Sequence, residues 1–370
     1  MASPIVSIFA SGDYDAHIRR GIEVLRGGGV AVLPTETVYG AAAAIAHPEG
    51  RRRLSTFRAD ESRPFTVHLA RPSDSEQYLG EVNDYARRII RKLWPGPVAL
   101  VFEVPEARRK EAARKWGVAE GDLYDTGGIT LRCPDHVVAS DVIGGVEGPV
   151  ALARSGSSVA RSAQELAEEL GDKADLIFDA GPSKYSKPST IIKVGTDSYE
   201  IVRQGVYDER IIDRLLRTTI LFVCSGNTCR SPMSEAIARS VLAERLGVSE
   251  HELEKKGINV MSAGSFAMPG ARATPQAVEA LRGMGLDLSG HRSRPLTVEL
   301  IHQADLIFTM SRNHAMAVTA LVPAASEKVT TLDPDGDIDD PIGGDTALYR
   351  DLAGNLRRLI EQRLQEQTLP

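Results

Sequence analysis

The 370-residue sequence is poor in cysteine and contains no long apolar run. Its three cysteines are too few for a disulfide framework, and no segment is long and apolar enough to cross a bilayer. No secretory signal peptide is recognisable at the N-terminus. We therefore expect a cytoplasmic protein that does not associate with a membrane.

The sequence also lacks internal repeats, low-complexity segments and an excess of positive charge. A net charge of -6 at pH 7 does not suggest direct bulk binding of nucleic acid. The length predicts two or three domains, each large enough to bury a core. A charged segment at 207–217 is the predicted linker between a first domain at 11–206 and a second domain at 218–366.

An apolar run at 218–223 leads directly into the loop 224–230, which has the strongest chemical signal in the chain. A strand that ends in a short glycine-containing loop brings backbone N–H groups around one point, where they bind an anion. Cys224 is the expected nucleophile for cleaving a phosphate ester, and Arg230 is the expected clamp on the phosphoryl oxygens.

A helix is predicted to follow the loop, with Ser231 as its N-cap and Pro232 at its first position. The positive end of this helix should lower the pKa of the Cys224 thiol. Gly226 and Asn227 suit the positive backbone φ angles of a tight loop. The remaining loop residues are expected to support the bound phosphate: Ser225, Thr228 and Cys229.

An acid must protonate the leaving group in such a mechanism. The acidic segment at 337–345 contains three candidates. Asp340, directly before a proline, is the expected general acid, and Asp337 and Asp339 are alternatives. A simple acidic turn would also explain the composition of the segment.

Residues 218–366 resemble the low-molecular-weight protein tyrosine phosphatase family, which has a Cys-x-x-x-x-x-Arg-Ser loop near its start and an Asp-Pro acid near its end. The resemblance implies roles for Cys224 as nucleophile, Arg230 as clamp and Asp340 as general acid, with the Ser231 hydroxyl supporting the thiolate. No cofactor is implied for this domain.

The coarse pattern of this half alternates strands and helices, which predicts an α/β fold with a doubly wound parallel four-stranded sheet. The expected strands are at 218–223, 257–262, 304–310 and 327–332, and the expected helices at 232–246, 274–284, 312–321 and 345–366.

Thr228 bears on the substrate of this domain. Tyrosine-directed members of the family usually carry an apolar residue there, whereas the arginine phosphatase branch carries threonine. Ile342 also replaces the aromatic residue that often follows Asp-Pro in tyrosine-directed members. Phosphoarginine on a protein is therefore favoured over phosphotyrosine.

Arsenate reduction is a third use of the same loop, but it needs resolving cysteines downstream. No cysteine follows Cys229, which disfavours that reaction. Cys229 is either a reversible disulfide partner of an oxidised Cys224 or a small packed residue.

The first half of the chain begins with a predicted amphipathic helix at 16–26 and an apolar strand at 30–33. The strand runs into the segment 34–40, Pro-Thr-Glu-Thr-Val-Tyr-Gly, whose hydroxyl groups and Tyr39 suit the rim of a ligand site. On spacing alone, the segment could equally be an ordinary turn.

Four motifs in order resemble the YrdC-like threonylcarbamoyl-AMP synthases, which have a twisted α/β domain. The motifs are Pro-Thr-Glu-Thr-Val-Tyr-Gly, Arg-Pro-Phe-Thr-Val-His, Trp-Pro-Gly-Pro and Leu-Arg-Cys-Pro-Asp-His. The resemblance implies that ATP, L-threonine and bicarbonate react to threonylcarbamoyl-AMP and pyrophosphate for tRNA threonylcarbamoyladenosine formation. It also implies Mg²⁺ with the ATP, and proteins that transfer the product to tRNA as partners.

The same resemblance assigns residues to the two ligands. Those expected to hold threonine are Thr35, His68 and Arg132. Those expected to contact ATP are Ser155, Ser189 and Arg203. Because such a reaction consists mostly of positioning and charge neutralisation, arginines and hydroxyl groups should line a concave site.

The sequence departs from the synthase pattern at two places. The usual Lys-x-Arg pair is absent in register, and Arg58 and Arg63 are the expected substitutes, although arginine does not reproduce the donor geometry of lysine. The usual Ser-x-Asn is replaced by Ser-Gly-Ser at 155–157. The alternative to a bifunctional enzyme is thus a phosphatase whose first domain is a degenerate, regulatory nucleotide- or threonine-binding module.

Overall fold

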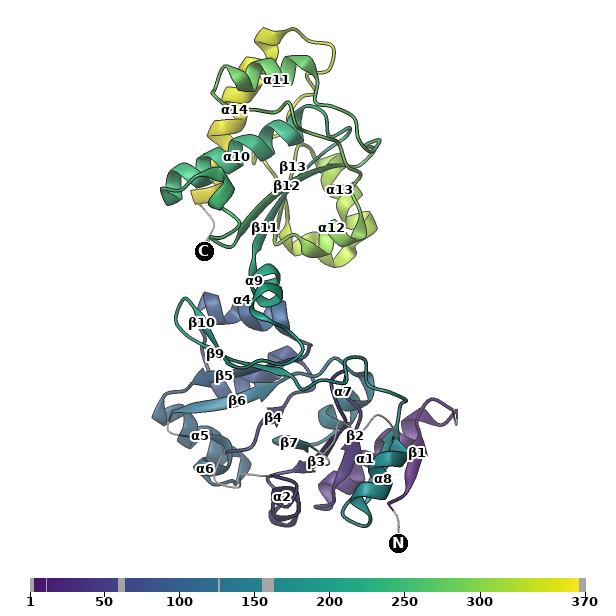
Figure 1. The fold of residues 1–370 in the computed structure, drawn as a ribbon. Coiled ribbons are helices and arrows are strands. Elements are labelled where there is room, and N and C mark those ends of the chain that lie inside the picture. The colour runs from purple at the N-terminus through teal and green to yellow at the C-terminus, as the bar shows by residue number, and fades with distance from the viewer. Residues whose placement is uncertain (1–2, 11, 59–63, 126, 155–162, 366–370) are drawn as a thin grey trace. The chain divides into compact units, whose positions relative to one another are not determined.

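The computed structural model describes residues 3–10, 12–58, 64–125, 127–154 and 163–365. The chain divides into two compact units, Met1–Leu216 and Arg217–Pro370, and each is described here by itself (Figure 1). The segment predicted as a linker contains helix α9 (Glu209–Leu216), whose Ile212 and Leu216 are buried in the core of the first unit. The limits 11–206 and 218–366 stay predictions.

The first unit is built on a mixed ten-stranded sheet with the order β1-β8-β2-β3-β7-β4-β6-β5-β9-β10. The strands are β1 Ile5–Ser7, β2 Ala31–Leu33, β3 Gly40–Ala44, β4 Val67–His68, β5 Val98–Glu103, β6 Gly128–Arg132, β7 Val150–Arg154, β8 Leu176–Asp179, β9 Thr190–Val194 and β10 Tyr199–Arg203. The helices are α1 Tyr14–Arg26, α2 Pro48–Ser55, α3 Glu76–Leu79, α4 Asp84–Leu93, α5 Glu106–Trp116, α6 Glu120–Leu123, α7 Val137–Gly144, α8 Ala163–Leu170 and α9.

Alternate residues of the central strands enter two different cores. Ala41 and Ala43 of β3 pack into one hydrophobic cluster with α4 and α8, whereas Ala42 and Ala44 pack into another with α1 and α7. This burial on both faces explains why β3 is uniformly apolar instead of alternating. The helix predicted at 16–26 and the strand predicted at 30–33 are present as α1 and β2.

Pairing between the strands brings motifs from distant segments together. β2 and β3 are antiparallel neighbours, so the segment 34–39 between them turns back at one end of the sheet. β4 and β6 are parallel, with His68 opposite Arg132. These residues are the last of their strands and lie at the same edge of the sheet.

The second unit is a doubly wound sheet of four parallel strands in the order β12-β11-β13-β14, as predicted. The strands are β11 Thr218–Cys224, β12 Ile258–Gly264, β13 Leu306–Thr309 and β14 Val329–Thr331. The helices are α10 Arg230–Leu246, α11 Pro275–Arg282, α12 Val298–Gln303, α13 Arg312–Leu321 and α14 Thr346–Gln365.

Helices cover both faces of this sheet. α10, α11 and α14 pack on one face, and α12 and α13 pack on the other (Figure 1). All residues of the central strand β11 are buried. Because the chain winds from β11 to opposite sides of the sheet, the end of β11 is a topological switch point, where α/β proteins bind their ligands.

Across the part of the chain that the structure describes, no helix combines the length and apolar character that crossing a membrane requires.

Candidate active sites

Cys224 is the last residue of β11 and lies at the switch point of the second sheet. Its side chain is only 3% exposed. The sulfur lies 2.9 Å from Ser231 Oγ, and the backbone N–H of Asn227 donates a hydrogen bond to it at 3.3 Å. The loop therefore surrounds the sulfur with polar partners, as the sequence predicts.

Asn227 holds the loop in shape. Its φ is 54°, the left-handed conformation that we expected, whereas Gly226 does not adopt a positive φ and that expectation was wrong. The amide Nδ2 of Asn227 donates to Ser231 Oγ and to Ser262 Oγ, both at 2.9 Å. Asparagine suits this position because its short side chain tolerates the left-handed region and bonds locally.

Gly264 lets the loop approach the neighbouring strand. A Cβ atom at this position would lie 2.4 Å from the carbonyl oxygen of Ser225 and 2.9 Å from the backbone nitrogen of Asn227. Any larger residue would displace the loop. The sequence reasoning did not identify Gly264, which is one of many glycines and becomes distinctive only once β12 is placed beside β11.

Arg230 and Asp340 meet beside the loop, although more than a hundred residues separate them. Arg230 is 5% exposed, and its Nη1 donates to the carbonyl oxygen of Ile338 at 2.8 Å. Its Nη2 donates to Asp340 Oδ2 and lies 3.5 Å from Ser225 Oγ.

Asp337, an alternative acid, instead accepts a hydrogen bond from the backbone N–H of Arg312 at 2.9 Å. The third acid, Asp339, is exposed.

The helix after the loop begins two residues earlier than predicted. α10 starts at Arg230 with Cys229 as its N-cap, so Ser231 and Pro232 are its second and third residues. The predicted cap was wrong because the Ser231 hydroxyl faces Cys224 instead of the helix N-terminus. The fixed φ of proline is tolerated throughout the first helical turn, since the N–H groups there lack intrahelical partners.

The electrostatics of Cys224 also differ from the prediction. Burial raises the pKa of the Cys224 thiol, and the bonds from Ser231 and Asn227 together with the charge of Arg230 oppose this effect only in part. The expectation of a lowered pKa was therefore wrong for this arrangement. The physical reason is that the sulfur is nearly solvent-free and that Arg230 is paired with Asp340.

Cys229 and Thr228 occupy the outer turn of the loop. Cys229 is buried, with its sulfur 3.4 Å from the Tyr349 hydroxyl and 3.5 Å from Thr274 Oγ1. Thr228 is half-buried, and its hydroxyl lies 3.7 Å from the Cys229 sulfur. Cys224 and Cys229 are both free thiols in this structure.

A cavity of about 360 Å³ in the first unit gathers most of the residues expected to bind threonine and ATP. Those that line it are Thr35, Tyr39, His68, Arg132, Ser189 and Arg203. Arg58 does not line it: its guanidinium lies over the ring of Phe65, 4.4 Å from the centroid, and donates to Pro64 O at 3.3 Å. Arg63 and Ser155 lie outside the described residues.

Arg132 is held by the segment that connects β2 to β3. Its Nη2 donates to Glu36 Oε1 at 3.1 Å and to Thr37 Oγ1 at 2.7 Å. Glu36 and Arg132 are 4% and 6% exposed. The Thr37 hydroxyl in turn lies 2.9 Å from Thr35 Oγ1. The sequence reasoning missed Glu36, although an acidic residue in an otherwise apolar and hydroxyl-bearing motif is a usable signal for a buried ion pair.

His68 lies opposite Arg132 across β4 and β6 in the cavity lining, and its imidazole is uncharged. Burial, together with the nearby charge of Arg132, lowers the pKa of His68 to about 3. Its Nδ1 contacts the backbone N–H of Leu152 at 3.2 Å and the carbonyl oxygen of Thr66 at 3.1 Å. At neutral pH, His68 therefore acts as an uncharged hydrogen-bonding group.

Ser189 and Arg203 form a further part of the cavity lining. Nη2 of Arg203 donates to the carbonyl oxygen of Ser189 at 2.8 Å and lies 3.4 Å from its hydroxyl. This close approach depends on Gly205, where a Cβ atom would lie 2.3 Å from Pro188 O. Two of the three residues expected to contact ATP are thus neighbours.

The described residues do not supply a protein cage for Mg²⁺. No group of three or more His, Cys, Asp or Glu side chains among them could hold a metal ion. Beside the cavity, one carboxylate oxygen of Glu36 already accepts a hydrogen bond from Arg132. We therefore derive no step through a protein-bound metal.

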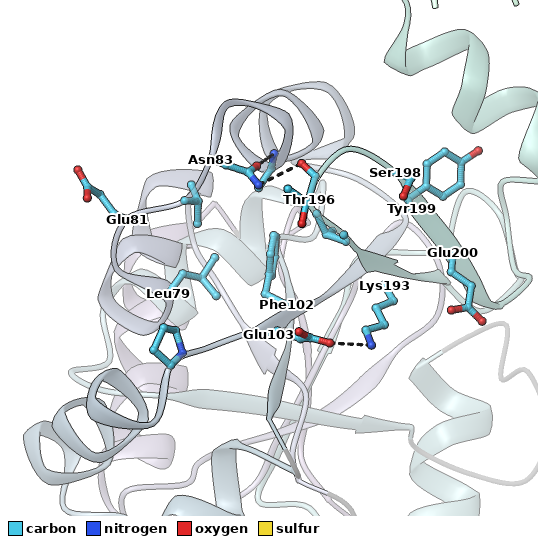
Figure 2. Close-up of a pocket in the computed structure, with 15 residues that line it drawn as sticks. Leu79, Glu81, Asn83, Phe102, Glu103, Lys193, Thr196, Ser198, Tyr199 and Glu200 are labelled. Atoms are coloured by element: carbon cyan, nitrogen blue, oxygen red, sulfur yellow. Dashed lines mark hydrogen bonds and ion pairs between the residues drawn. The ribbon is translucent and has the colours of Figure 1, made fainter. Parts of the chain in front are cut away.

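A separate pocket of about 530 Å³ lies between the start of α4, the end of β5 and the β9–β10 hairpin (Figure 2). In its lining, Lys193 pairs with Glu103 at 2.8 Å, and Asn83 Nδ2 donates to the backbone oxygen of Thr196 at 3.1 Å. The predicted site residues that the structure describes lie elsewhere. We assign this pocket no role.

The fold and the loop define the second unit as a cysteine-based phosphatase domain, joined in the same chain to an α/β unit with an arginine-lined cavity. Comparison with known families agrees. Residues 23–205 match the model of the Sua5/YciO/YrdC family, described as telomere recombination. Residues 219–368 match the model described as low molecular weight phosphotyrosine protein phosphatase.

Individual relatives match each part. A protein-arginine-phosphatase of Bacillus subtilis is 42% identical over 148 residues, which are 39% of this chain and 92% of that protein. A putative threonylcarbamoyl-AMP synthase of Mycobacterium tuberculosis is 31% identical over 207 residues, which are 52% of this chain and 87% of that protein. A crystal structure of a YwlE mutant from B. subtilis is 40% identical and covers 40% of this chain and 97% of its own, with a TM-score of 0.36.

The chain therefore belongs to both families, to the Sua5/YciO/YrdC family in its first part and to the low molecular weight phosphatase family in its second. The resemblances noted in the sequence are confirmed.

Proposed function

We propose that this protein is a bifunctional enzyme. Its second domain, 218–366, removes a phosphoryl group from a protein through a cysteine intermediate. Its first domain, 11–206, forms threonylcarbamoyl-AMP and pyrophosphate from ATP, L-threonine and bicarbonate, for transfer to tRNA by other proteins. The observation that carries the phosphatase activity is the meeting of Cys224, Arg230 and Asp340 around one loop.

The phosphatase reaction follows from this geometry. When the phosphoryl group replaces Asp340 at Arg230, the proton of the Cys224 thiol passes through solvent to the Asp340 carboxylate. The resulting thiolate attacks phosphorus and forms a phosphocysteine, while Arg230 and the loop N–H groups bind the three non-bridging oxygens. Asp340 gives its proton to the leaving group as the bond to phosphorus breaks. The resulting carboxylate then takes a proton from the water that hydrolyses the phosphocysteine, which regenerates the thiolate and releases phosphate.

We favour phosphoarginine as the substrate of this domain. Thr228 stands in the loop wall where an apolar residue would give an aromatic ring a better surface, and its hydroxyl can orient a water. Ile342 is 70% exposed beside Asp340 and offers no ring for stacking. The B. subtilis relative with 42% identity is named a protein-arginine-phosphatase, although the relative of Ralstonia solanacearum with 35% identity is named a probable protein-tyrosine-phosphatase.

Thr228→Ile is expected to shift the preference toward phosphotyrosine. The ratio of kcat/KM for phosphoarginine to that for phosphotyrosine should fall about thirtyfold, since one added apolar contact favours phosphotyrosine and one lost hydroxyl contact disfavours phosphoarginine, each by about 1 kcal/mol. Both values are measured on the purified chain with matched phosphopeptides. Thr228→Ser, which keeps the hydroxyl, is the control. An unchanged ratio in Thr228→Ile would contradict the assignment.

The synthase reaction rests on the cavity of the first unit. Arg132 and Arg203 supply positive charge to the cavity, and Thr35 and Ser189 supply hydroxyl groups. A threonine-derived carbamate held there can attack the α-phosphorus of ATP, with pyrophosphate as the leaving group. Arginine charge stabilises the spread negative charge of such a transition state.

The alternative is that the first domain only binds nucleotide or threonine and regulates the phosphatase. One observation favours it, because Arg58 packs on Phe65 and does not line the cavity. The departure from the Lys-x-Arg pattern is thus not compensated by Arg58 in this arrangement.

Pyrophosphate release separates these two readings. We expect the purified chain to release pyrophosphate when ATP, threonine and bicarbonate are all present, and to lose at least tenfold in rate in Arg203→Ala, since a hydrogen bond to a charged group contributes about 1.5–3 kcal/mol. The measurement is a coupled pyrophosphate assay with threonine omitted as the blank. Binding of ATP without threonine-dependent release would support the regulatory module.

A further inference from the structure

His314 lies against the phosphate loop, although no sequence motif pointed to it. It is in the first turn of α13 and is 6% exposed. Its Nε2 lies 2.9 Å from the hydroxyl of Ser225, the residue that follows Cys224. Its Nδ1 lies 2.7 Å from the hydroxyl of Ser311, the N-cap of the helix. The imidazole therefore bridges a helix cap and the catalytic loop.

The position of the imidazole proton follows from these contacts. Burial and the charge of Arg230 lower the pKa of His314, against the opposing charges of Asp340 and Asp337, so the ring is neutral near pH 7 and carries one proton. The Ser311 hydroxyl accepts from the backbone N–H of His314 at 3.4 Å and has its own proton to give to Nδ1. In the tautomer in which Ser311 donates to Nδ1, the ring proton is on Nε2 and is donated to the Ser225 hydroxyl.

In this tautomer, no acceptor for the proton of the Ser225 hydroxyl is found among the residues that the structure describes. A serine hydroxyl accepts two hydrogen bonds and donates one. Nε2 of His314 donates to the Ser225 oxygen, and Nη2 of Arg230 approaches it at 3.5 Å, so both acceptor positions are engaged. The same Nη2 also contacts Asp340. The Ser225 oxygen therefore lies beside the guanidinium group of Arg230, which binds the phosphoryl group in the proposed reaction.

We propose that His314 is a positioning residue that holds the Ser225 hydroxyl as a hydrogen-bond donor to an oxygen of the bound phosphoryl group. The inference rests on the proposed phosphatase activity. In that reaction, Ser225 adds a side-chain donor to the backbone N–H groups and to Arg230, and His314 prevents the hydroxyl from turning its lone pairs toward the anionic substrate.

Two amide substitutions of His314 distinguish this role from simple helix capping. Glutamine can place an N–H near the position of Nε2, so His314→Gln keeps the donor to Ser225. Asparagine is shorter and reproduces only the Nδ1 end, so His314→Asn keeps the contact to Ser311 and loses the one to Ser225. A capping role predicts the opposite ranking of the two variants.

The expected result is that Ser225→Ala and His314→Asn each lower kcat/KM for the phosphorylated peptide about tenfold, while His314→Gln stays within about threefold of the wild type. The double variant Ser225→Ala/His314→Asn should be no slower than Ser225→Ala alone, because both changes remove the same donor. His251→Asn, an exposed histidine in the same unit, is the matched control and should equal the wild type. Wild-type rates in Ser225→Ala, or a slower His314→Gln than His314→Asn, would overturn the proposal.

A binding measurement keeps this test separate from the proposed phosphatase activity. Calorimetric titration with inorganic phosphate requires no turnover and should show about tenfold weaker binding in Ser225→Ala and His314→Asn. If the wild-type chain hydrolyses no phosphopeptide but these variants still bind phosphate more weakly, the proposed activity fails and the role of His314 stands. Equal phosphate affinity in wild type and Ser225→Ala refutes the role of His314.

Discussion

Replacing Cys224 by serine is expected to abolish hydrolysis of phosphopeptides and to leave threonine-dependent pyrophosphate release unchanged. A serine hydroxyl at the end of β11 keeps nearly the same shape but gives up its proton far less readily than a thiol and is a weaker nucleophile, and neither Ser231 nor Asn227 is a base that could activate it. Loss of a nucleophile lowers kcat by at least about 10³-fold in comparable cases. Both reactions can be followed on one preparation of the variant.

Cys133→Ala is the matched control for this experiment. Cys133 is fully buried in the core of the first unit, where burial raises the pKa of its thiol to about 12 and makes it unreactive. The control should keep the phosphatase rate. Hydrolysis by the Cys224→Ser variant at more than a few per cent of the wild-type rate would show that another group forms the intermediate. Loss of pyrophosphate release in the same variant would show that the two activities are coupled.

The catalytic loop could be predicted from sequence because its parts are local. Cys224 and Arg230 lie in one loop after an apolar run, and the residues 220–223 are all apolar because helices cover both faces of their sheet. Helix α12 (Val298–Gln303) was missed because six residues form a helix only with tertiary support, and so leave little periodic signal.

The electrostatic state of the loop could not be predicted in the same way. The sequence shows an arginine and a helix start near Cys224, but it does not show that the sulfur is buried or that Arg230 pairs with Asp340. His314 reaches Ser225 only because β13 pairs with β11 and places the start of α13 beside the loop. These are consequences of packing between segments that are far apart in the sequence.

In the first unit, the motifs could be recognised one by one, but their convergence required the ten-stranded sheet. His68 and Arg132 become neighbours through the pairing of β4 with β6. Arg58 was a reasonable substitute for the missing lysine by charge alone, yet the ring of Phe65 provides a cation–π partner that holds it elsewhere.

Arg132→Ala is expected to eliminate threonine-dependent pyrophosphate release and to destabilise the first unit by about 3–5 kcal/mol, the usual cost of removing one partner of a buried ion pair. The reason is that the Glu36 carboxylate, 4% exposed, would lose its charged partner while its other oxygen already lacks one among the described residues. Denaturant unfolding followed by tryptophan fluorescence measures this effect, because Trp94 and Trp116 report only on the first unit.

The double variant Glu36→Gln/Arg132→Met separates the two consequences. It removes both charges, so it should recover most of the lost stability while pyrophosphate release stays absent. If the double variant also recovered the release, Arg132 would be a structural residue and not a ligand of the substrates. If Arg132→Ala kept its midpoint of unfolding, water would have to reach Glu36 and the pair would not be buried in solution. If the double variant recovers stability but not pyrophosphate release, the charge of Arg132 acts in the reaction. Glu36 then serves to hold Arg132 in the cavity lining.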